Sequence, residues 1–216
     1  MSLKKSLYHK RILVTCGPTW VPIDNIRVIS NTSTGKLGQI LAEILAKTGA
    51  KVTLLEGPVM QGVKAKSIKV IKFSFFDDFL SQLTYELKKK YDIVIHAAAV
   101  ADYKLKKPFK GKINSNWSSL KINLISTRKI INLIKRISPR TLLIGFKQED
   151  KLNQKLARLK AKKLFKNAHC DFVIANRVNR KRYEAYIIDE RLNILAHVTH
   201  RKQLAEKLTQ ILKEVA

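Results

Sequence analysis

The sequence predicts an α/β domain with a three-layer, doubly wound, Rossmann-like architecture, in which a mostly parallel sheet ends in a C-terminal β-hairpin. Two observations support this class. Short runs of branched apolar residues alternate along the chain with longer segments whose apolar residues repeat at helical spacing. The run Ile93-Val94-Ile95 is continuously apolar, as in strands that are covered on both faces. We expect one domain over residues 1–216, with residues 1–9 as a short N-terminal extension, because this length can bury a single core.

The first elements follow from their local patterns. Residues 11–16 form a branched apolar run that stops at Gly17, so a strand and then a turn are predicted. The polar segment 20–30 is longer than an ordinary connection and is expected to be a functional loop. Apolar residues repeat at helical spacing over residues 36–48, and Gly49 supplies a C-terminal stop for that helix.

The middle of the chain continues this alternation. Residues 51–55, 68–73 and 92–99 are predicted strands. Residues 77–90 are predicted to form an amphipathic helix with Asp77 as its N-cap. Because strand and helix patterns alternate, we expect parallel strands that are joined by right-handed crossovers.

The same alternation resumes after a lysine-rich loop over residues 103–116. The remaining elements are expected to be a helix at 127–137, a strand at 141–146, a helix at 151–167, a strand at 171–175, a hairpin of 183–188 with 194–198, and a final helix at 200–214. The apolar hairpin could supply a surface for a second subunit, or it could be a sheet edge that is covered by its own helix.

Small residues follow several of the predicted strands. They are Gly17, the loop 31–38, the segment 97–102 and the residue pair that ends in Phe146. In an open sheet of this type, ligands bind beyond the carboxyl ends of the strands, where the strand order switches. We therefore predict a ligand site at this edge of the sheet.

The loop before the first helix matches neither of the common phosphate-binding motifs. The Gly-x-Gly-x-x-Gly fingerprint of nicotinamide-binding proteins is absent after the first strand, and the Walker pattern also fails. Ser33, Gly35 and Gly38 nevertheless open a helix, where free N–H groups can hold a phosphate or a carboxylate. Equally, Ser33 or Thr34 could be an ordinary N-cap, and Gly38 a close contact between helix and sheet.

Three polar residues near the predicted strand ends have both a functional and a structural interpretation. Asp102 could contact a nucleotide or a metal ion, or could cap a turn. Lys112 could neutralise a phosphate, or could be one more solvated charge in a lysine-rich loop. His96 could contact a ligand, or could be a core histidine with a satisfied hydrogen bond.

The charge balance is unusual, because 43 Lys and Arg against 16 Asp and Glu give a formal net charge of +27. Such an excess attracts polyanions, nucleic acid included. The basic residues are dispersed over several segments without interleaved aromatic residues, so a solvated basic exterior with non-specific nucleic-acid affinity explains the charge more simply than a dedicated nucleic-acid site.

Cysteine, histidine and hydropathy patterns narrow the possible classes. Cys16 and Cys170 adjoin apolar runs and have no metal-ligand spacing, so both are predicted to be packed, reduced thiols, and no protein metal ligand is assigned. No apolar stretch approaches the ~20 residues that cross a bilayer, and no secretory segment is present. We expect a cytoplasmic protein without a membrane partner.

Several segments, taken together, resemble bacterial phosphopantothenoylcysteine synthetase, also called phosphopantothenate-cysteine ligase, of coenzyme A biosynthesis. The resemblance covers nearly the whole chain from Arg11. The segments that carry it are Gly17-Pro18-Thr19, Pro22-Ile23-Asp24, residues 27–38, Glu56-Gly57-Pro58, residues 97–103, Gly111-Lys112-Ile113, Gly145-Phe146, and residues 171–176.

The resemblance implies a two-step reaction. CTP, usually with Mg2+, activates the carboxylate of 4'-phosphopantothenate to an acyl-cytidylate and releases pyrophosphate; L-cysteine then displaces CMP and forms an amide. It also implies a homodimer. Because the chain begins near the first synthetase strand, we expect a stand-alone ligase that carries no FMN, with a separate decarboxylase as a possible partner.

The resemblance also implies roles for individual residues. Asn31 holds the acyl-cytidylate, with the Ala99 N–H near the same carbonyl, and Lys112 lies on a mobile flap over the phosphates. The nucleotide-binding residues that it implies are His96, Ala97, Ala98, Asp102, Phe146 and a helix lysine among Lys160, Lys163 and Lys166.

The chain departs from the family pattern at four places, which are Asn114-Ser115-Asn116 after Lys112, residues 127–130, residues 147–150, and Arg177. Three of them lie near the expected nucleotide. An alternative function is therefore a catalytically weakened relative that binds nucleic acid or acidic proteins through its basic exterior. A reductase of the nucleotide-sugar or short-chain type is disfavoured by the missing glycine fingerprint.

Overall fold

The structure is a computed structural model that describes residues 6–179 and 182–216; residues 1–5 of the expected N-terminal extension lie outside that range. One eight-stranded sheet forms its centre. Its strands in chain order are β1 (Arg11–Cys16), β4 (Lys51–Glu56), β5 (Lys69–Lys72), β6 (Ile93–His96), β9 (Leu142–Gln148), β10 (Phe172–Asn179), β11 (Arg182–Asp189) and β12 (Ile194–Val198).

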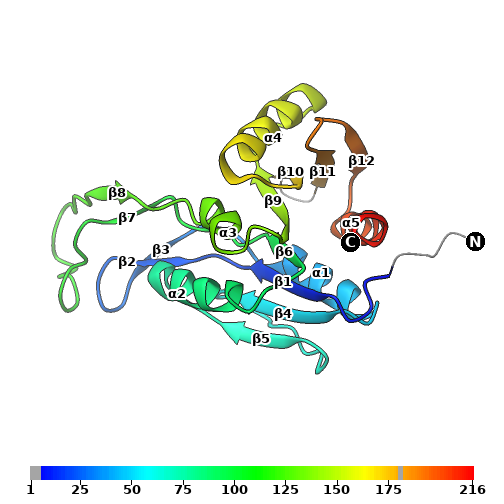
Figure 1. The fold of residues 1–216 in the computed structure, drawn as a ribbon. Helices are drawn as coiled ribbons and strands as arrows, with labels where there is room; N and C mark the ends of the chain where they lie inside the picture. Colours follow the sequence, from blue (N-terminus) through cyan, green and yellow to red (C-terminus); the bar gives the residue numbers. More distant parts are fainter. Residues whose placement is uncertain (1–5, 180–181) are drawn as a thin grey trace, which may run out of the picture.

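The strand order across the sheet is β12-β11-β10-β9-β6-β1-β4-β5 (Figure 1). The strands from β10 to β5 pair in parallel, and β11 and β12 extend one edge as an antiparallel hairpin. The chain moves outward from β1 through β4 to β5, and then returns to the other side of β1 with β6. The predicted doubly wound fold is therefore confirmed, and the strand order switches between β1 and β6.

Helices cover both faces of the sheet and complete three layers (Figure 1). They are α1 (Lys36–Ala46), α2 (Phe76–Leu87), α3 (Ile131–Ile137), α4 (Gln154–Ala168) and α5 (Arg201–Val215). Helix α1 packs against α5 over one face, whereas α2, α3 and α4 share the apolar cluster on the other.

The central strand β1 shows why its sequence is apolar throughout. Ile12 and Val14 are fully buried in the cluster of α1 and α5, and Leu13 is fully buried in the opposite cluster. Successive side chains of a strand point to opposite faces, so a strand between two helical layers needs apolar residues at every position.

Several predicted bounds shift for identifiable reasons. The N-cap of α2 is Phe75 rather than Asp77, and it is Asp78 whose carboxylate accepts the Ser74 N–H at 2.9 Å. Helix α3 begins at Ile131 rather than at residue 127, because the N–H and hydroxyl of Thr127 donate to the carbonyls of Asp102 and Ala101 at 2.9 and 2.7 Å. These tertiary hydrogen bonds replace the first helical turn.

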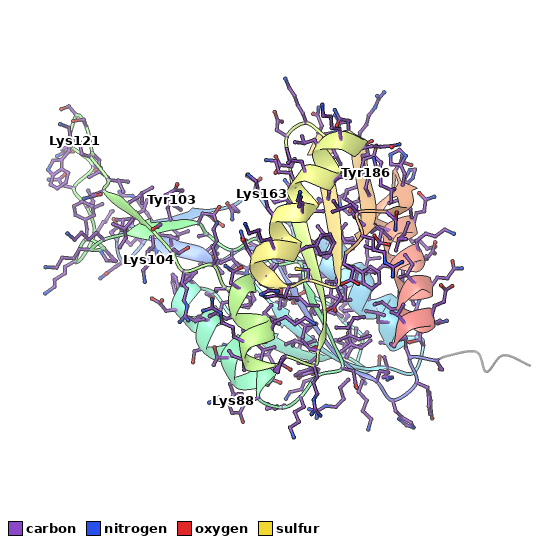
Figure 2. The ribbon with its side chains drawn as sticks, turned by 45° about the horizontal axis from the view of Figure 1, so that its top comes forward. Lys88, Tyr103, Lys104, Lys121, Lys163 and Tyr186 are labelled. Atoms are coloured by element: carbon purple, nitrogen blue, oxygen red, sulfur yellow. The ribbon has the colours of Figure 1, made fainter. Side chains whose placement is uncertain are left out.

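Two short antiparallel ribbons were not predicted, and both begin in segments that were predicted as loops. Strand β2 (Trp20–Pro22) pairs with β3 (Val28–Ser30), and β7 (Tyr103–Leu105) pairs with β8 (Leu124–Ser126). Residues 103–126, here called the arm, project from the body of the protein; Tyr103 and Lys104 lie on β7, and Lys121 lies near the far end of the arm (Figure 2). Strands of three residues carry too little periodicity to be predicted.

The C-terminal hairpin belongs to the core of the sheet. Tyr183, Ala185 and Ile187 are buried in the cluster of α5, while Tyr186 and Ile188 are buried on the side of α4. The chain's own helices therefore cover both faces of β11, and a subunit contact through the hairpin stays a prediction.

The structure also bears on the predictions for the two cysteines and for membrane-spanning helices. Cys16 and Cys170 are buried free thiols, and burial raises the pKa of Cys170 to about 12, as predicted for cysteines that pack as small apolar residues. Across residues 6–179 and 182–216, every helix is too short or too polar to span a bilayer.

Candidate functional site

A cavity of about 500 Å³ lies at the carboxyl ends of the strands beside the switch in strand order. Three chain segments and four residues of the C-terminal part form its walls. The lining residues are 31–38, 97–100, Asp102, 146–148, Asn176, Val178, Tyr183 and Arg201. The predicted site at this edge thus corresponds to a real cavity.

A second cavity, of about 590 Å³, lies at the opposite end of the sheet. Its lining includes Leu142 and Phe172, the first residues of β9 and β10, together with residues of α5. Ligands of doubly wound sheets bind beyond the carboxyl ends of the strands, so the smaller cavity is the candidate site.

The loop before α1 shows the close Gly38 contact that its sequence allowed, but not the side-chain caps. Gly35 is the N-cap of α1, with φ of 71° and no side-chain cap bond, so Ser33 and Thr34 are not caps. Gly38 packs against β1 so closely that an added Cβ would lie 2.3 Å from the Cβ of Cys16. This contact brings the helix start to the end of β1.

The start of α1 supplies hydrogen-bond donors to the cavity. The first helical N–H with an intrahelical acceptor is that of Gln39, which donates to Gly35 O at 3.2 Å. The N–H groups of Lys36, Leu37 and Gly38 precede it, and all three residues line the cavity. A helix N-terminus in this state favours an anionic ligand.

The end of β6 forms the opposite wall and is held rigidly by β1. Ala97 and Ala98 donate their N–H groups to the carbonyl and hydroxyl of Thr15 at 3.1 and 3.2 Å. The N–H of Ala99 donates to Gly17 O at 2.9 Å. The expected role of the Ala99 N–H toward an acyl group is therefore not available here, because that donor is already used within the sheet. Gly17 lies behind the wall and does not line the cavity.

Asn31 bridges the two walls. Its side-chain nitrogen donates to the carbonyls of Ala99 and Val100 at 3.0 and 3.4 Å. Two carbonyl acceptors fix the nitrogen on this side, so the carboxamide oxygen is the group left for a ligand. The structure thus brings Asn31 and Ala99 together, as the sequence resemblance implies.

His96 belongs to the core rather than to the cavity lining. It is buried, its Nδ1 lies 3.1 Å from the hydroxyl of Thr15, and its ring stacks on Phe79. Burial lowers the pKa of His96 to about 4, so the ring is neutral at pH 7. The interpretation as a satisfied core histidine is the one that the structure supports.

Asp102 lines the cavity but already has a cationic partner. Its carboxylate forms an ion pair of 2.5 Å with Lys129, and both side chains are about 60% exposed (62% and 61%). Lys129 comes from the segment 127–130, one of the places where the chain departs from the family pattern.

The cations that line the cavity differ from those expected. Lys160 pairs with Glu149 at 2.9 Å, and Lys163 is an exposed residue of α4 (Figure 2); neither lines the cavity. The lining cations are Lys36, Lys147 and Arg201. Lys147 follows Phe146, which lines the cavity as predicted, so the rule of strand ends could have found it.

Lys112 lies in the loop of the arm between β7 and β8, outside the cavity lining. Its neighbours are fixed at the tip of the β2–β3 ribbon. Gly111 O accepts the Asn25 N–H at 3.2 Å, and the Ile113 N–H donates to the Asp24 carboxylate at 3.0 Å. The structure therefore does not bring Lys112 to Asn31 and Ala99.

Asp24 fixes the loop of the arm between β7 and β8. Its buried carboxylate also accepts the N–H groups of Ile26 and Arg27 and pairs with the Arg27 guanidinium at 2.8 Å. The hydrogen bond from Ile113 and then those from Ile26 and Arg27 outweigh burial and lower the pKa of Asp24 to about 2. This carboxylate is charged at every physiological pH.

Sequence reasoning missed the residues that β10, β11 and α5 contribute. Asn176, Tyr183 and Arg201 line the cavity although they are far from the loop 31–38 in sequence. Only the position of Asn176 at the end of the predicted strand 171–175 was a usable signal. Among the described residues, no group of three or more His, Cys, Asp or Glu could hold a metal ion.

Comparisons with known proteins agree with this geometry. Residues 7–215 match the profile of the family described as DNA/pantothenate metabolism flavoprotein, C-terminal domain. The coenzyme A biosynthesis bifunctional protein CoaBC of Thermococcus kodakarensis is 39% identical over 80% of this chain and 42% of its own length. For the CoaBC of Borreliella burgdorferi the identity is 34%, over 97% of this chain and 54% of its own length.

A solved structure supports the same assignment. The DNA/pantothenate metabolism flavoprotein from Streptococcus pneumoniae superposes with a TM-score of 0.86 at 26% identity, over 96% of this chain and 100% of its own. This chain spans about half the length of the curated relatives that it matches. Sequence, fold and cavity agree, and the chain belongs to the family of DNA/pantothenate metabolism flavoprotein C-terminal domains.

Proposed function

We propose that this chain is a phosphopantothenate-cysteine ligase of coenzyme A biosynthesis that uses CTP. The relatives named as coenzyme A biosynthesis proteins support the pathway. The observation that carries the proposal is one cavity at the switch point, in which the N–H groups of the α1 start and the cations Lys36, Lys147 and Arg201 face the same space. Anionic reactants can meet there.

The proposed reaction has two balanced steps. The carboxylate of 4'-phosphopantothenate attacks the α-phosphorus of CTP, and pyrophosphate leaves. The cysteine amine then attacks the acyl carbonyl, CMP leaves, the amide forms and the amine loses a proton. Both steps concentrate negative charge, so positioning and preorganised positive charge are the chemistry that the protein has to supply.

The residues of the cavity have matching proposed roles. The N–H groups at the start of α1 and Lys36 neutralise phosphate oxygens. Asn31, fixed by Ala99 and Val100, directs its carboxamide oxygen to the reacting groups and can accept an N–H of the attacking amine. Phe146 packs against the nucleotide.

The donor set of the cavity also fits the proposed use of Mg2+. Asp102 is the one acidic residue in the lining formed by the described residues, and it is paired with Lys129. Such a site suits an ion that the nucleotide phosphates and water hold, as Mg2+ usually is. When bound, the ion would neutralise phosphate charge.

We also propose a homodimer, which the arm supports more than the C-terminal hairpin does. Trp117, Leu124 and Ile125 of the arm are exposed apolar residues, at 54%, 42% and 40% of their full area. Exposed apolar groups that gather on one projecting element are typical of contact surfaces. Light scattering of the purified protein tests the dimer. A separate decarboxylase stays a proposed partner.

The activity has a direct test. Purified protein receives 4'-phosphopantothenate, L-cysteine and Mg2+, and pyrophosphate release is compared with CTP, with ATP and without nucleotide. We expect release that depends on both CTP and phosphopantothenate, and phosphopantothenoylcysteine as the product. No release under any of these conditions would contradict the ligase.

The Asp102–Lys129 ion pair favours one alternative, in which the nucleotide site is weakened and the basic exterior binds polyanions. A protein of this kind would bind RNA with an affinity that falls steeply with salt, and it would show no ligase turnover. Measurement of RNA binding between low and physiological salt, beside the ligase assay, distinguishes the two functions.

A further inference from the structure

A second cleft, of about 390 Å³, adjoins the candidate site. The two share Tyr183 and Arg201 in their linings. The cleft lies between the β10–β11 hairpin and the start of α5, and its other lining residues are Arg177, Arg182, Glu184, Thr199 and His200. It therefore extends the cavity away from the loop 31–38 and towards α5.

Three arginines and one carboxylate, that of Glu184, are among the lining residues of this cleft. Glu184 forms an ion pair of 2.9 Å with Arg177. The other oxygen of Glu184 lies 3.2 Å from the Tyr186 hydroxyl and 3.0 Å from Nε2 of His197. This network occupies Glu184, so within residues 6–179 and 182–216 neither Arg182 nor Arg201 has an acidic partner within 4 Å.

The orientation of Arg201 is fixed by packing. Its guanidinium lies 5.0 Å from the centre of the Tyr183 ring, and Tyr183 itself is 6% exposed. A guanidinium that stacks on a buried ring loses little further freedom when it binds an anion. Arg201 is also the first residue of α5, whose first internal hydrogen bond runs from Leu204 N–H to His200 O. The N–H groups before that bond add positive potential at the same place.

We propose that this cleft is an anion subsite that binds a diphosphate group, through Arg182 and Arg201. The planar fork of arginine matches phosphate oxygens in two hydrogen bonds, and among the described residues no carboxylate within 4 Å competes for either guanidinium group. Continuity with the main cavity favours a small ligand over a polymer. The inference goes beyond the proposed ligase, because it requires only that a diphosphate binds.

The test measures binding and not turnover. Inorganic pyrophosphate, without Mg2+ or substrates, is titrated calorimetrically into the wild type, Arg182→Gln and Arg201→Gln. Lys202→Gln is the matched control, since Lys202 is the neighbouring cation but is 78% exposed and pairs with Glu206 on the helix surface. We expect about tenfold weaker binding in each arginine variant, the loss typical of one charge-assisted hydrogen bond, and little change in the control.

A fourth variant gives an effect of the opposite sign. Glu184→Gln removes the carboxylate that neutralises Arg177, so pyrophosphate should bind more tightly than to the wild type. A parallel titration with CTP separates two ligand sources. If Arg182→Gln weakens both ligands, the cleft holds the terminal phosphates of a nucleotide, whereas a loss confined to pyrophosphate means that it holds the free diphosphate.

The inference is overturned if the wild type does not bind pyrophosphate, or if the arginine variants bind it as the Lys202→Gln control does. Its failure is distinguishable from that of the proposed function. A protein without ligase turnover that still binds pyrophosphate through Arg182 keeps the subsite, and an active ligase without that dependence loses it.

Discussion

The wall of the candidate site and the arm are built in opposite ways. The wall at the ends of β1 and β6 is an extension of the sheet, in which Thr15 and Gly17 accept the N–H groups of residues 97–99. The arm projects from the body, and a buried carboxylate, that of Asp24, anchors the loop of the arm next to Lys112. The groups of the wall are therefore preorganised, whereas the proposed role of Lys112 requires a movement of the arm.

The largest expected effect comes from a substitution in the wall of the candidate site. Asn31→Ala removes the side chain that links the loop 31–38 to Ala99 and faces the ligand, so kcat of the ligase should fall about 10²- to 10³-fold, as for loss of one preorganised polar group. Asn116→Ala on the exposed arm is the control. Wild-type turnover of Asn31→Ala would remove this residue from the mechanism.

The next effect concerns the rigidity of the wall. Gly38→Ala places a Cβ 2.3 Å from the Cβ of Cys16, so helix and strand must separate. We expect a loss of about 1–3 kcal/mol in the free energy of unfolding, measured by urea denaturation. Gly62→Ala is the matched control, because its nearest contact is the flexible end of Lys72. Equal stability of both variants would mean that α1 is not packed this tightly.

A smaller effect tests whether the arm delivers its lysine. Lys112→Ala should lower kcat/KM about tenfold without a change in thermal stability, the loss of one cation that acts on a phosphate. Lys121→Ala, near the far end of the same arm, controls for the loss of charge (Figure 2). If both variants have the same rate, Lys112 is one more solvated charge.

The smallest expected effect concerns the contact of Asp24 with the loop of the arm and the pH dependence of stability that it causes. The pKa of Asp24 is lowered from its ordinary value of 3.8 to about 2, first because the carboxylate accepts the Ile113 N–H. Its contribution to stability is therefore complete above pH 4 and is lost as the pH falls towards 2. Asp24→Asn should remove this dependence and speed hydrogen exchange of the Ile113 amide at pH 7. Asp150→Asn, at an exposed acid outside the arm, should do neither.

The periodicity of apolar residues was sufficient to predict the main helices and strands, because each of them buries a face. The apolar repeat of α1 and the continuous apolar run of β6 identified them correctly, and the rule of strand ends identified the loop 31–38, residues 97–102 and Phe146 as neighbours. The ribbon β7–β8 was missed, since its pairing depends on contacts between residues about 20 positions apart rather than on a local repeat.

Site residues were predictable where their position followed from the end of a strand. Asn31 meets Ala99 as expected, but Arg201 enters the cavity only because α5 packs beside α1. His96 carries no sequence signal that separates a core histidine from a ligand contact, and only its burial against Phe79 decides.

The sequence by itself determined the doubly wound fold and the edge of the sheet at which a ligand would bind, because alternating burial patterns and small residues after strands are local properties. The tertiary structure decided which hydrogen-bond donors are available to a ligand and which cations line the cavity. Ala99 has its N–H engaged, Lys112 lies on the arm, and Lys147 and Arg201 line the cavity. Hydrogen bonds and charges compete for partners in three dimensions, and that competition is settled only when distant segments meet.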